Sequence, residues 1–193
     1  MARTIEYNPK EVLTQAMNLF WEKGYKSTSI QDIVTATKIK PGSIYAAYGN
    51  KEGIFKAVIE LYTVSSLEKV TNILKADGDI LENIEEFLNV AIITAISNEI
   101  NNGCLLVKTL LVVSHKDEKI QEQIVMFYKQ LESILKNSIS KAKERGQTLV
   151  EPDMFTTFIF STIYGSHVHY KTFKQKKILE QNVALLMKQL RAL

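Results

Sequence analysis

Residues 39–55, which read IKPGSIYAAYGNKEGIF, combine hydroxyl groups, aromatic rings and small side chains between flanking lysines. A helix that only filled a core would carry more aliphatic side chains than this stretch does. Serine and tyrosine hydroxyls donate hydrogen bonds to phosphate oxygens, lysines pair with phosphate charge, and small side chains admit a base edge or a methyl group. The residue types therefore indicate contact with a phosphate-bearing partner.

Two helices are predicted before this stretch. The first begins after Asn8, which is a good N-cap, has Pro9 in its first position and ends at Gly24. The second is short, and we expect Thr28 to cap it with Gln31 as the reciprocal residue of a capping box. These helices would form the support for the residues that follow.

A third helix is predicted from Pro41 to about Tyr48, and Asn50 is expected to cap a fourth that runs to about Lys75. Two short helices joined by a tight turn and held by a longer first helix form a helix-turn-helix arrangement. The second short helix of such a unit enters the major groove of DNA. Ile44 is expected to anchor this helix to the first two.

The charge distribution agrees with a polyanionic partner. The formal net charge of the chain is +3, and all of this excess lies within residues 1–51, so the remainder is neutral. An excess of this size also arises by chance over fifty residues, and charge alone does not decide the function.

Residues 24–55, GYKSTSIQDIVTATKIKPGSIYAAYGNKEGIF, resemble the DNA-binding domain of TetR-family transcriptional regulators. The positions that match the family pattern are Gly24, Tyr25, Thr28, Ile30, Asp32, Ile33, Ala36, Ile39, Gly42, Ser43, Ile44, Tyr45, Tyr48, Lys51 and Glu52. Two positions depart from it: Lys38 stands where the family usually has glycine, and Ala47 where it often has histidine. A lysine at the first of these positions must accept a turn conformation that favours glycine.

The resemblance implies which residues meet DNA. The expected phosphate contacts are Thr28, Ser43, Tyr45, Tyr48 and Lys51. The residues expected nearest the bases are Lys40, Pro41 and Ala46. Gly42 would let the backbone approach a phosphate closely.

The rest of the chain is also predicted to be helical, so the fold class is all-α. Helices are expected within residues 76–97, 101–114, 117–146, 152–172 and 175–191. We divide the chain into a DNA-binding domain, residues 1–50, and a ligand-binding and dimerisation domain, residues 51–193. The resemblance implies a helical ligand pocket and a homodimer formed through about residues 152–191, where Gly165 and Ser166 permit close approach. The alternative for the apolar helix 152–172 is an intramolecular core.

Cys104 is the single cysteine of the chain, which excludes an intrachain disulfide and favours a reducing compartment. If Asn102 caps the next helix, Cys104 occupies its second position, where the helix dipole lowers a thiol pKa, and Lys108 lies one turn further on. The segment resembles a TetR subgroup that responds to electrophiles and oxidants, in which a lysine on the penultimate helix, here Lys171, approaches the cysteine. The alternative is a small buried hydrophobic residue.

The candidate ligand pocket is a largely apolar set with a few hydrogen-bonding groups, which favours a small hydrophobic or aromatic inducer. Its members are Tyr62, Phe87, Tyr128, Phe158, Thr162 and His167. His167 and His169 are two residues apart and do not share a helix face, so no metal site is expected.

These patterns favour a homodimeric transcriptional repressor that binds a palindromic operator and is released by a small molecule or by cysteine modification. No nucleophile–base–acid set, phosphate-binding glycine loop or metal cluster indicates an enzyme, and no cofactor is expected. The longest apolar run is about half of the roughly 20 residues that a membrane span needs, and we expect a cytoplasmic protein. The alternative is a helical ligand-binding or interaction protein without specific DNA binding, and salt-dependent duplex binding would separate the two.

Overall fold

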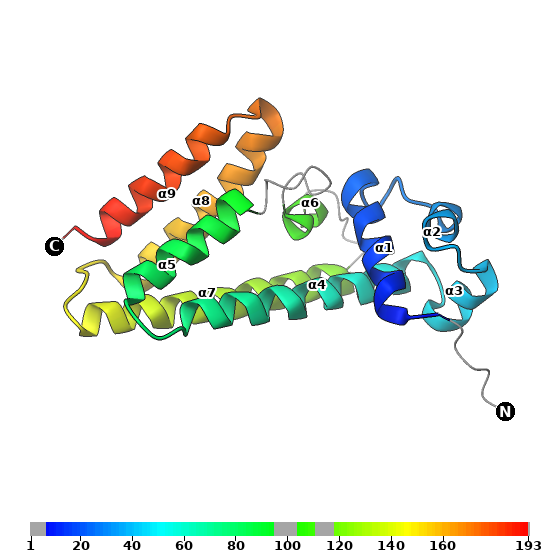
Figure 1. The fold of residues 1–193 in the computed structure, drawn as a ribbon, viewed down its shortest axis with the longest axis horizontal. Helices are drawn as coiled ribbons and strands as arrows, with labels where there is room; N and C mark the ends of the chain where they lie inside the picture. Colours follow the sequence, from blue (N-terminus) through cyan, green and yellow to red (C-terminus); the bar gives the residue numbers. More distant parts are fainter. Residues whose placement is uncertain (1–6, 95–103, 111–117, 193) are drawn as a thin grey trace.

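The computed structural model describes residues 7–94, 104–110 and 118–192, and these residues are helical with connecting turns. The elements are α1 (Pro9–Lys23), α2 (Ile30–Thr37), α3 (Pro41–Tyr48), α4 (Lys51–Leu74), α5 (Ile80–Leu88), a π-helical segment (Asn89–Thr94), α6 (Leu105–Leu110), α7 (Glu118–Glu144), α8 (Pro152–Phe173) and α9 (Lys176–Leu190). Figure 1 shows α1–α3 grouped at one end, with α4 leading from them along α7 into the larger group of helices. The predicted all-α fold is confirmed for the described residues.

The first helix begins and ends where the sequence predicts. The side chain of Asn8 accepts a hydrogen bond from the Lys10 amide at 3.0 Å, and Pro9 occupies the first helical position. Gly24 ends the helix with a φ of 82°, a conformation that glycine adopts without steric cost. The predicted caps of α1 are therefore confirmed.

The start of α2 lies one residue later than predicted. Ser29 is the N-cap: its amide donates to Asp32 Oδ2 at 2.8 Å, and the Asp32 amide donates to Ser29 Oγ at 3.1 Å. The prediction of a capping box between Thr28 and Gln31 is wrong, because Thr28 is buried and its hydroxyl donates to the Gly24 carbonyl at 2.8 Å. Thr28 thus closes the loop between α1 and α2 and is not available to cap the helix.

Lys38 adopts the left-handed turn conformation that is expected at this position. It ends α2 with φ 57° and ψ 20°, in the left-handed region, and its amide donates to the Val34 carbonyl at 2.8 Å. Its side chain is exposed, so the turn between α2 and α3 keeps a helix-turn-helix geometry without glycine.

The core of the small unit consists of aromatic and aliphatic side chains that α4 shares with α1–α3. Ile44 of α3 is almost completely buried, as are Ile54 and Phe55 of α4. The Phe55 ring lies 4.7 Å from that of Phe20 and 4.5 Å from that of Tyr25, between ring centroids. Ile44 therefore anchors α3 to the rest of the unit, as predicted.

The fourth helix is confirmed from its cap to its end. Asn50 Oδ1 accepts from the Gly53 amide at 2.9 Å, and the helix ends at Leu74, with Lys75 as its C-cap. Because α4 packs against α1 and α3 at its start and against α5 and α7 further along, it belongs to both parts of the molecule. The predicted domain boundary at residue 50 consequently falls at a rigid helix start and not in a linker.

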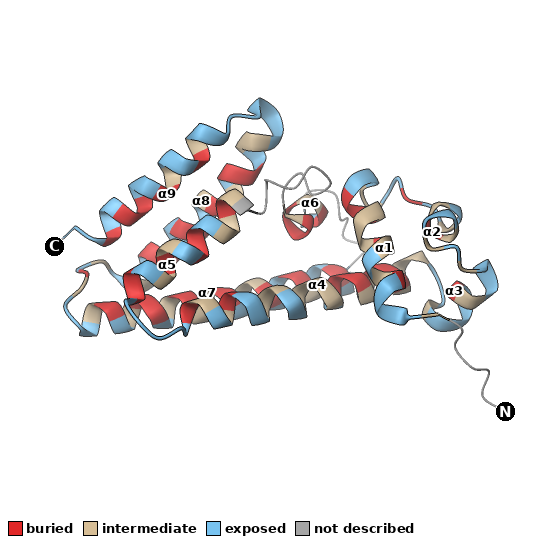
Figure 2. Cartoon of the chain, viewed as in Figure 1, coloured by how far each residue is buried: buried red, intermediate tan, exposed pale blue. Residues whose placement is uncertain are grey.

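The larger part follows the predicted order of helices. Figure 2 shows buried residues on the helix faces turned toward neighbouring helices and exposed residues on the outer faces. Residues 95–97, 101–103, 111–114 and 117 of three predicted helices lie outside the described residues, and so does the predicted cap Asn102. Within the described ranges, no helix is both long enough and apolar enough to cross a bilayer.

Candidate nucleic-acid interface and ligand pocket

The helix α3 leaves nearly all of its side chains on the surface. Only Ile44 is buried, whereas Tyr45 remains 51% exposed although it is a large aromatic residue. The predicted contact residues that are exposed are Lys40, Pro41, Gly42, Tyr45 and Ala46, and those that are half-buried are Ser43, Tyr48 and Lys51. A short helix held by one buried residue thus presents hydroxyls, small side chains and a lysine together.

Thr28, one of the predicted phosphate contacts, does not reach this surface. Its side chain is 1% exposed and donates to the Gly24 carbonyl, so the prediction of a Thr28 phosphate contact is wrong. Ser29, which sequence reasoning missed, is the exposed hydroxyl at the start of α2. The Ser29–x–x–Asp32 spacing was the signal that could have found it.

Lys51 has a structural role within the small unit. Its ammonium donates to the Tyr25 carbonyl at 3.1 Å and the Lys26 carbonyl at 3.4 Å. It also lies 4.7 Å from the centroid of the Tyr25 ring. Lys51 therefore links the first turn of α4 to the loop between α1 and α2.

An ion pair joins α2 to the end of α1. Asp32 Oδ1 lies 2.6 Å from the Lys23 ammonium at the end of α1. The hydrogen bond from Lys23, together with those from the Ser29 hydroxyl and amide, holds the pKa of the Asp32 carboxyl well below its usual range. Asp32 is accordingly ionised at neutral pH and links two helices.

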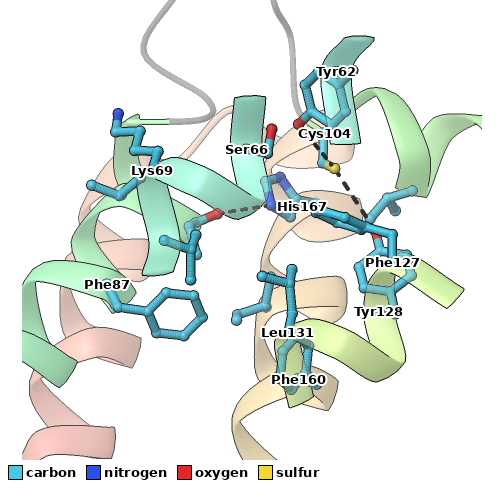
Figure 3. Close-up of a pocket in the computed structure, with 15 residues that line it drawn as sticks. Tyr62, Ser66, Lys69, Phe87, Cys104, Phe127, Tyr128, Leu131, Phe160 and His167 are labelled. Atoms are coloured by element: carbon cyan, nitrogen blue, oxygen red, sulfur yellow. Dashed lines mark hydrogen bonds between the residues drawn. The ribbon is translucent and has the colours of Figure 1, made fainter. Parts of the chain in front are cut away.

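A cavity of about 210 Å³ lies inside the larger part, between α4, α5, the π-helical segment, α6, α7 and α8. Figure 3 shows its aromatic and aliphatic lining around the imidazole of His167. The residues that line it are Tyr62, Ser66, Lys69, Val70, Phe87, Val90, Ala91, Cys104, Val107, Phe127, Tyr128, Leu131, Phe160, Ile163 and His167. Four predicted pocket residues, Tyr62, Phe87, Tyr128 and His167, come together here with Cys104.

Two predicted pocket residues, Phe158 and Thr162, do not line the cavity. Phe158 is 47% exposed on α8, and the Thr162 hydroxyl donates to the Phe158 carbonyl at 2.9 Å. The cavity is lined instead by Phe160, Ile163 and His167, which follow the helical spacing of three and four residues. The sequence showed that α8 is apolar on more than one face, but not which face meets the pocket.

Cys104 lies between two phenols. Its sulfur is 3.6 Å from the Tyr62 hydroxyl and 3.8 Å from the Tyr128 hydroxyl (Figure 3). Burial raises the pKa of both tyrosines, and the nearby thiol adds to the shift, so both phenols are neutral. Cys104 precedes α6, which begins at Leu105, so the prediction that it occupies the second position of that helix is wrong.

Neither predicted lysine partner of the thiol lines the cavity. The Lys108 ammonium donates to the Trp21 carbonyl of α1 at 3.2 Å. Burial lowers the pKa of Lys108, and the charges of Lys171 and Lys174 lower it further, against a smaller opposite effect of Cys104. Lys171 is exposed. Lys108 thus connects α6 to the end of α1.

His167 is the one imidazole among the described residues that line the pocket. It is 5% exposed, and its Nε2 lies 3.0 Å from the Ala91 carbonyl oxygen in the π-helical segment. Its Nδ1 has no hydrogen-bond partner among the described residues. Burial lowers the pKa of His167, and the hydrogen bond to Ala91 opposes this shift. No group of three or more His, Cys, Asp and Glu side chains in the described part of the chain is arranged to hold a metal ion.

Two family descriptions match the chain. Residues 12–58 match the bacterial regulatory proteins of the tetR family, and residues 81–186, more than half of the chain, match the tetracyclin repressor-like C-terminal domain. The chain belongs to the TetR family. The predicted membership of the TetR family and the predicted fold class are thereby confirmed, whereas the resemblance to the subgroup that responds to electrophiles and oxidants stays a prediction.

Relatives and solved structures agree with this assignment. YezE of Bacillus subtilis (strain 168), described as an HTH-type transcriptional regulator, is 26% identical over 147 residues, 76% of each chain. The repressor BdcR of Escherichia coli (strain K12) is 27% identical over 139 residues, 72% of this chain and 69% of BdcR. A cysteine mutant of the TetR-family regulator CifR, complexed with a 26-bp operator DNA, superposes with a TM-score of 0.83 at 23% identity. The superposition covers 98% of this chain and 99% of CifR, and at this identity it shows the fold alone.

The TetR-family chain carries a row of exposed apolar side chains on its last two helices. The large members are Met154, Phe158, Val168 and Phe173 on α8 and Leu185 on α9. Gly165 is exposed on α8, and a Cβ added there would meet no atom of this chain within 4 Å. Ser166 is buried, and its hydroxyl accepts from the Asn182 amide at 3.0 Å, so it joins α8 to α9 within one chain.

Proposed function

We propose that this TetR-family chain is a homodimeric transcriptional repressor whose affinity for a palindromic operator is set by a small molecule in the pocket. The observation that carries the proposal is the surface of α3, where one buried isoleucine supports an otherwise exposed helix. Membership of a family of regulatory proteins supports a regulator and not an enzyme. Binding to chromosomal DNA would place it in the cytoplasm.

The DNA-binding surface follows from the exposure of individual groups. The hydroxyls of Tyr45 and Ser43 would donate to phosphates. The Ser29 hydroxyl already donates to Asp32 Oδ2 at 2.6 Å, so it does not take the role predicted for Thr28. The exposed Lys40 side chain, at the N-cap of α3, would lie nearest the bases together with Pro41. The remaining members of the surface are Gly42, Ala46 and Tyr48 on α3 and Lys51 at the start of α4.

A dimer is required by the small size of this surface. One eight-residue helix reaches few base edges, so useful specificity needs two half-sites about one DNA turn apart. The exposed apolar side chains of α8 and α9 form a face that a second copy would cover. Gly165 within that face would let two α8 helices approach closely. The proposal keeps the predicted division of the chain into a DNA-binding domain, residues 1–50, and a ligand-binding and dimerisation domain, residues 51–193.

The DNA-binding proposal is tested on the DNA immediately upstream of the protein's own gene. Fluorescence anisotropy should show saturable binding to a palindromic site, weakening as salt increases because bound phosphates release counterions. A scrambled duplex of equal length and composition is the control. Equal binding to both duplexes at low and moderate salt would contradict the proposal and favour an interaction protein.

The dimer is tested by sedimentation of a charge variant. Phe158→Glu places a carboxylate in the apolar face of α8 and should shift the protein from dimer to monomer. Val64→Glu on α4 is the matched control, since Val64 is also an exposed apolar residue but lies on another helix. Unchanged sedimentation of the Phe158 variant would place the interface elsewhere.

Thiol modification is a second candidate signal, because Cys104 lines the cavity and a small electrophile that enters the pocket would meet its sulfur. Its immediate neighbours are neutral phenols and not a lysine, which supports a pocket ligand over a thiolate switch. Operator binding by the wild type and by Cys104→Ala is compared with and without mild oxidant. Release of the wild type alone would support the thiol signal, and equal release would exclude it.

A further inference from the structure

The Nδ1 atom of His167 is a buried polar atom in the pocket lining without a hydrogen-bond partner among the described residues. Most buried polar atoms in folded proteins are paired, and an unpaired one destabilises the folded state. Figure 3 shows the imidazole in the midst of the lining residues, with the other ring nitrogen bonded to Ala91. His167 itself lines the pocket, so a ligand held there is a candidate partner for this buried atom.

The contact with Ala91 determines what His167 offers to a ligand. A carbonyl oxygen only accepts hydrogen bonds, so Nε2 carries the proton in the contact of 3.0 Å. In the neutral imidazole Nδ1 then has a free lone pair and acts as an acceptor. Burial favours this neutral form by lowering the pKa of His167. A ligand group that satisfies Nδ1 must consequently be a hydrogen-bond donor.

The thiol and phenol groups of the lining do not need a hydrogen-bond donor from a ligand, because they have partners among themselves. The hydroxyls of Tyr62 and Tyr128 each lie within hydrogen-bonding distance of the Cys104 sulfur. Among the described residues that line it there is no aspartate or glutamate, and the single lysine of that set, Lys69, is exposed. An anionic ligand group near His167 would face a lone pair in a poorly solvated space, which is unfavourable.

The size of the cavity limits the ligand. Its volume is about 210 Å³. An engineered apolar cavity of roughly 150 Å³ binds benzene, so this pocket has room for one aromatic ring with a short substituent. Five of the lining residues carry benzene or phenol rings that can pack on such a ring: Tyr62, Phe87, Phe127, Tyr128 and Phe160.

We propose that the pocket binds a neutral, mostly apolar molecule of about one substituted aromatic ring that donates a hydrogen bond to Nδ1 of His167 from a hydroxyl or N–H group. This inference rests on the proposed function and specifies the ligand of the same pocket. It assigns His167 as the residue that selects the ligand by its hydrogen-bond donor.

The test uses three probes of the same shape that differ in one group. Isothermal titration calorimetry compares para-ethylphenol, which has a donor, with para-ethyltoluene, which has a methyl group there, and para-ethylbenzoate, which is an anion. The phenol should bind the wild type about tenfold more tightly than the toluene, and the benzoate should bind most weakly. Equal or tighter binding of the toluene or the benzoate, or no binding of the phenol, would overturn the inference.

A variant then assigns the preference to His167. His167→Phe keeps a ring but removes the acceptor, so the phenol and the toluene should bind it equally. Thr162→Val, five residues before His167 on α8 and outside the lining, is the matched control and should keep the tenfold preference. A tenfold preference that survives in a folded His167→Phe protein would overturn the role of His167. If this variant does not fold, the wild-type comparison still decides the donor requirement.

Operator binding by each ligand-free protein is measured in parallel. Specific operator binding without a preference for the phenol would overturn the inference and leave the repressor proposal standing. A phenol preference in a protein that binds no operator would support the inference about the pocket and contradict the repressor proposal. The two failures are therefore distinguishable.

Discussion

The surface of α3 and the pocket use their side chains in opposite ways. The α3 helix buries only Ile44 and leaves its aromatic and hydroxyl groups toward solvent, whereas the pocket places its aromatic groups in the interior. The contact surface is formed by one stretch of eight residues, while the pocket is assembled from α4–α8 and the π-helical segment. The proposed DNA contacts therefore lie on the surface of the molecule, whereas the proposed ligand contacts lie inside it.

This difference predicts how each region responds to substitution. Exposed side chains on α3 contribute little to the free energy of unfolding, so their replacement should alter DNA binding alone. Pocket side chains support neighbouring helices as well as a ligand, so their replacement should alter stability and ligand affinity together. The variants below challenge this contrast.

Phe87→Ala should have the largest effect on stability. The Phe87 side chain is buried at the pocket wall, and its removal should lower the free energy of unfolding by about 3–5 kcal/mol. Denaturant unfolding followed by circular dichroism measures the change. Tyr45→Ala, which also removes an aromatic ring, is the control and should change stability little because its ring is half exposed. Similar losses for both variants would break the contrast.

Gly53→Ala should disturb the junction between the end of α3 and the start of α4. A Cβ at Gly53 would overlap the Tyr48 carbonyl oxygen at the end of α3, so the junction with α4 must shift. We expect a loss of roughly 1–3 kcal/mol in unfolding free energy and much weaker operator binding. At Gly42 the same Cβ meets no atom within 4 Å, so Gly42→Ala should unfold like the wild type. Equal thermal midpoints of the two variants would contradict this account.

Tyr45→Phe should separate DNA affinity from stability. It removes one exposed hydroxyl and keeps the ring, so operator affinity should fall about tenfold through the loss of a phosphate hydrogen bond. Unfolding free energy should remain within about 0.5 kcal/mol of the wild type. Anisotropy and denaturant unfolding on the same preparations measure the two quantities. An unchanged operator affinity would remove Tyr45 from the interface.

Asp32→Asn should have the smallest effect, and one that depends on pH. The pKa of Asp32 is lowered in the folded state, so its ionised form stabilises the fold above the ordinary aspartate pKa of roughly 3.9, and this contribution declines as the pH falls. The variant should melt slightly below the wild type at pH 7, and the difference should shrink below about pH 4. Glu22→Gln, an exposed position on α1, is the charge-matched control. A difference that grows on acidification would contradict the assignment.

Sequence reasoning succeeded where neighbours in the chain decide the structure. The caps Asn8 and Asn50 act through amides two or three residues away, and the left-handed turn at Lys38 follows from the same local geometry. The pocket membership of Tyr62 and Tyr128 was also predicted, because both stand among apolar residues on long helices. Phe158 and Thr162 were misplaced because α8 has an apolar side that faces the pocket and another that is exposed.

The sequence by itself determined the helical order, the caps Asn8 and Asn50 and the exposed composition of α3, since each depends on local backbone hydrogen bonds or on residue type. Only the tertiary structure decided that Thr28 closes a loop, that Lys51 is bonded to the carbonyls of Tyr25 and Lys26, and that Lys108 reaches the Trp21 carbonyl. The physical reason is that long or hydroxyl-bearing side chains satisfy whichever partner packing brings near. That partner can be many residues distant, as Lys108 and Trp21 show.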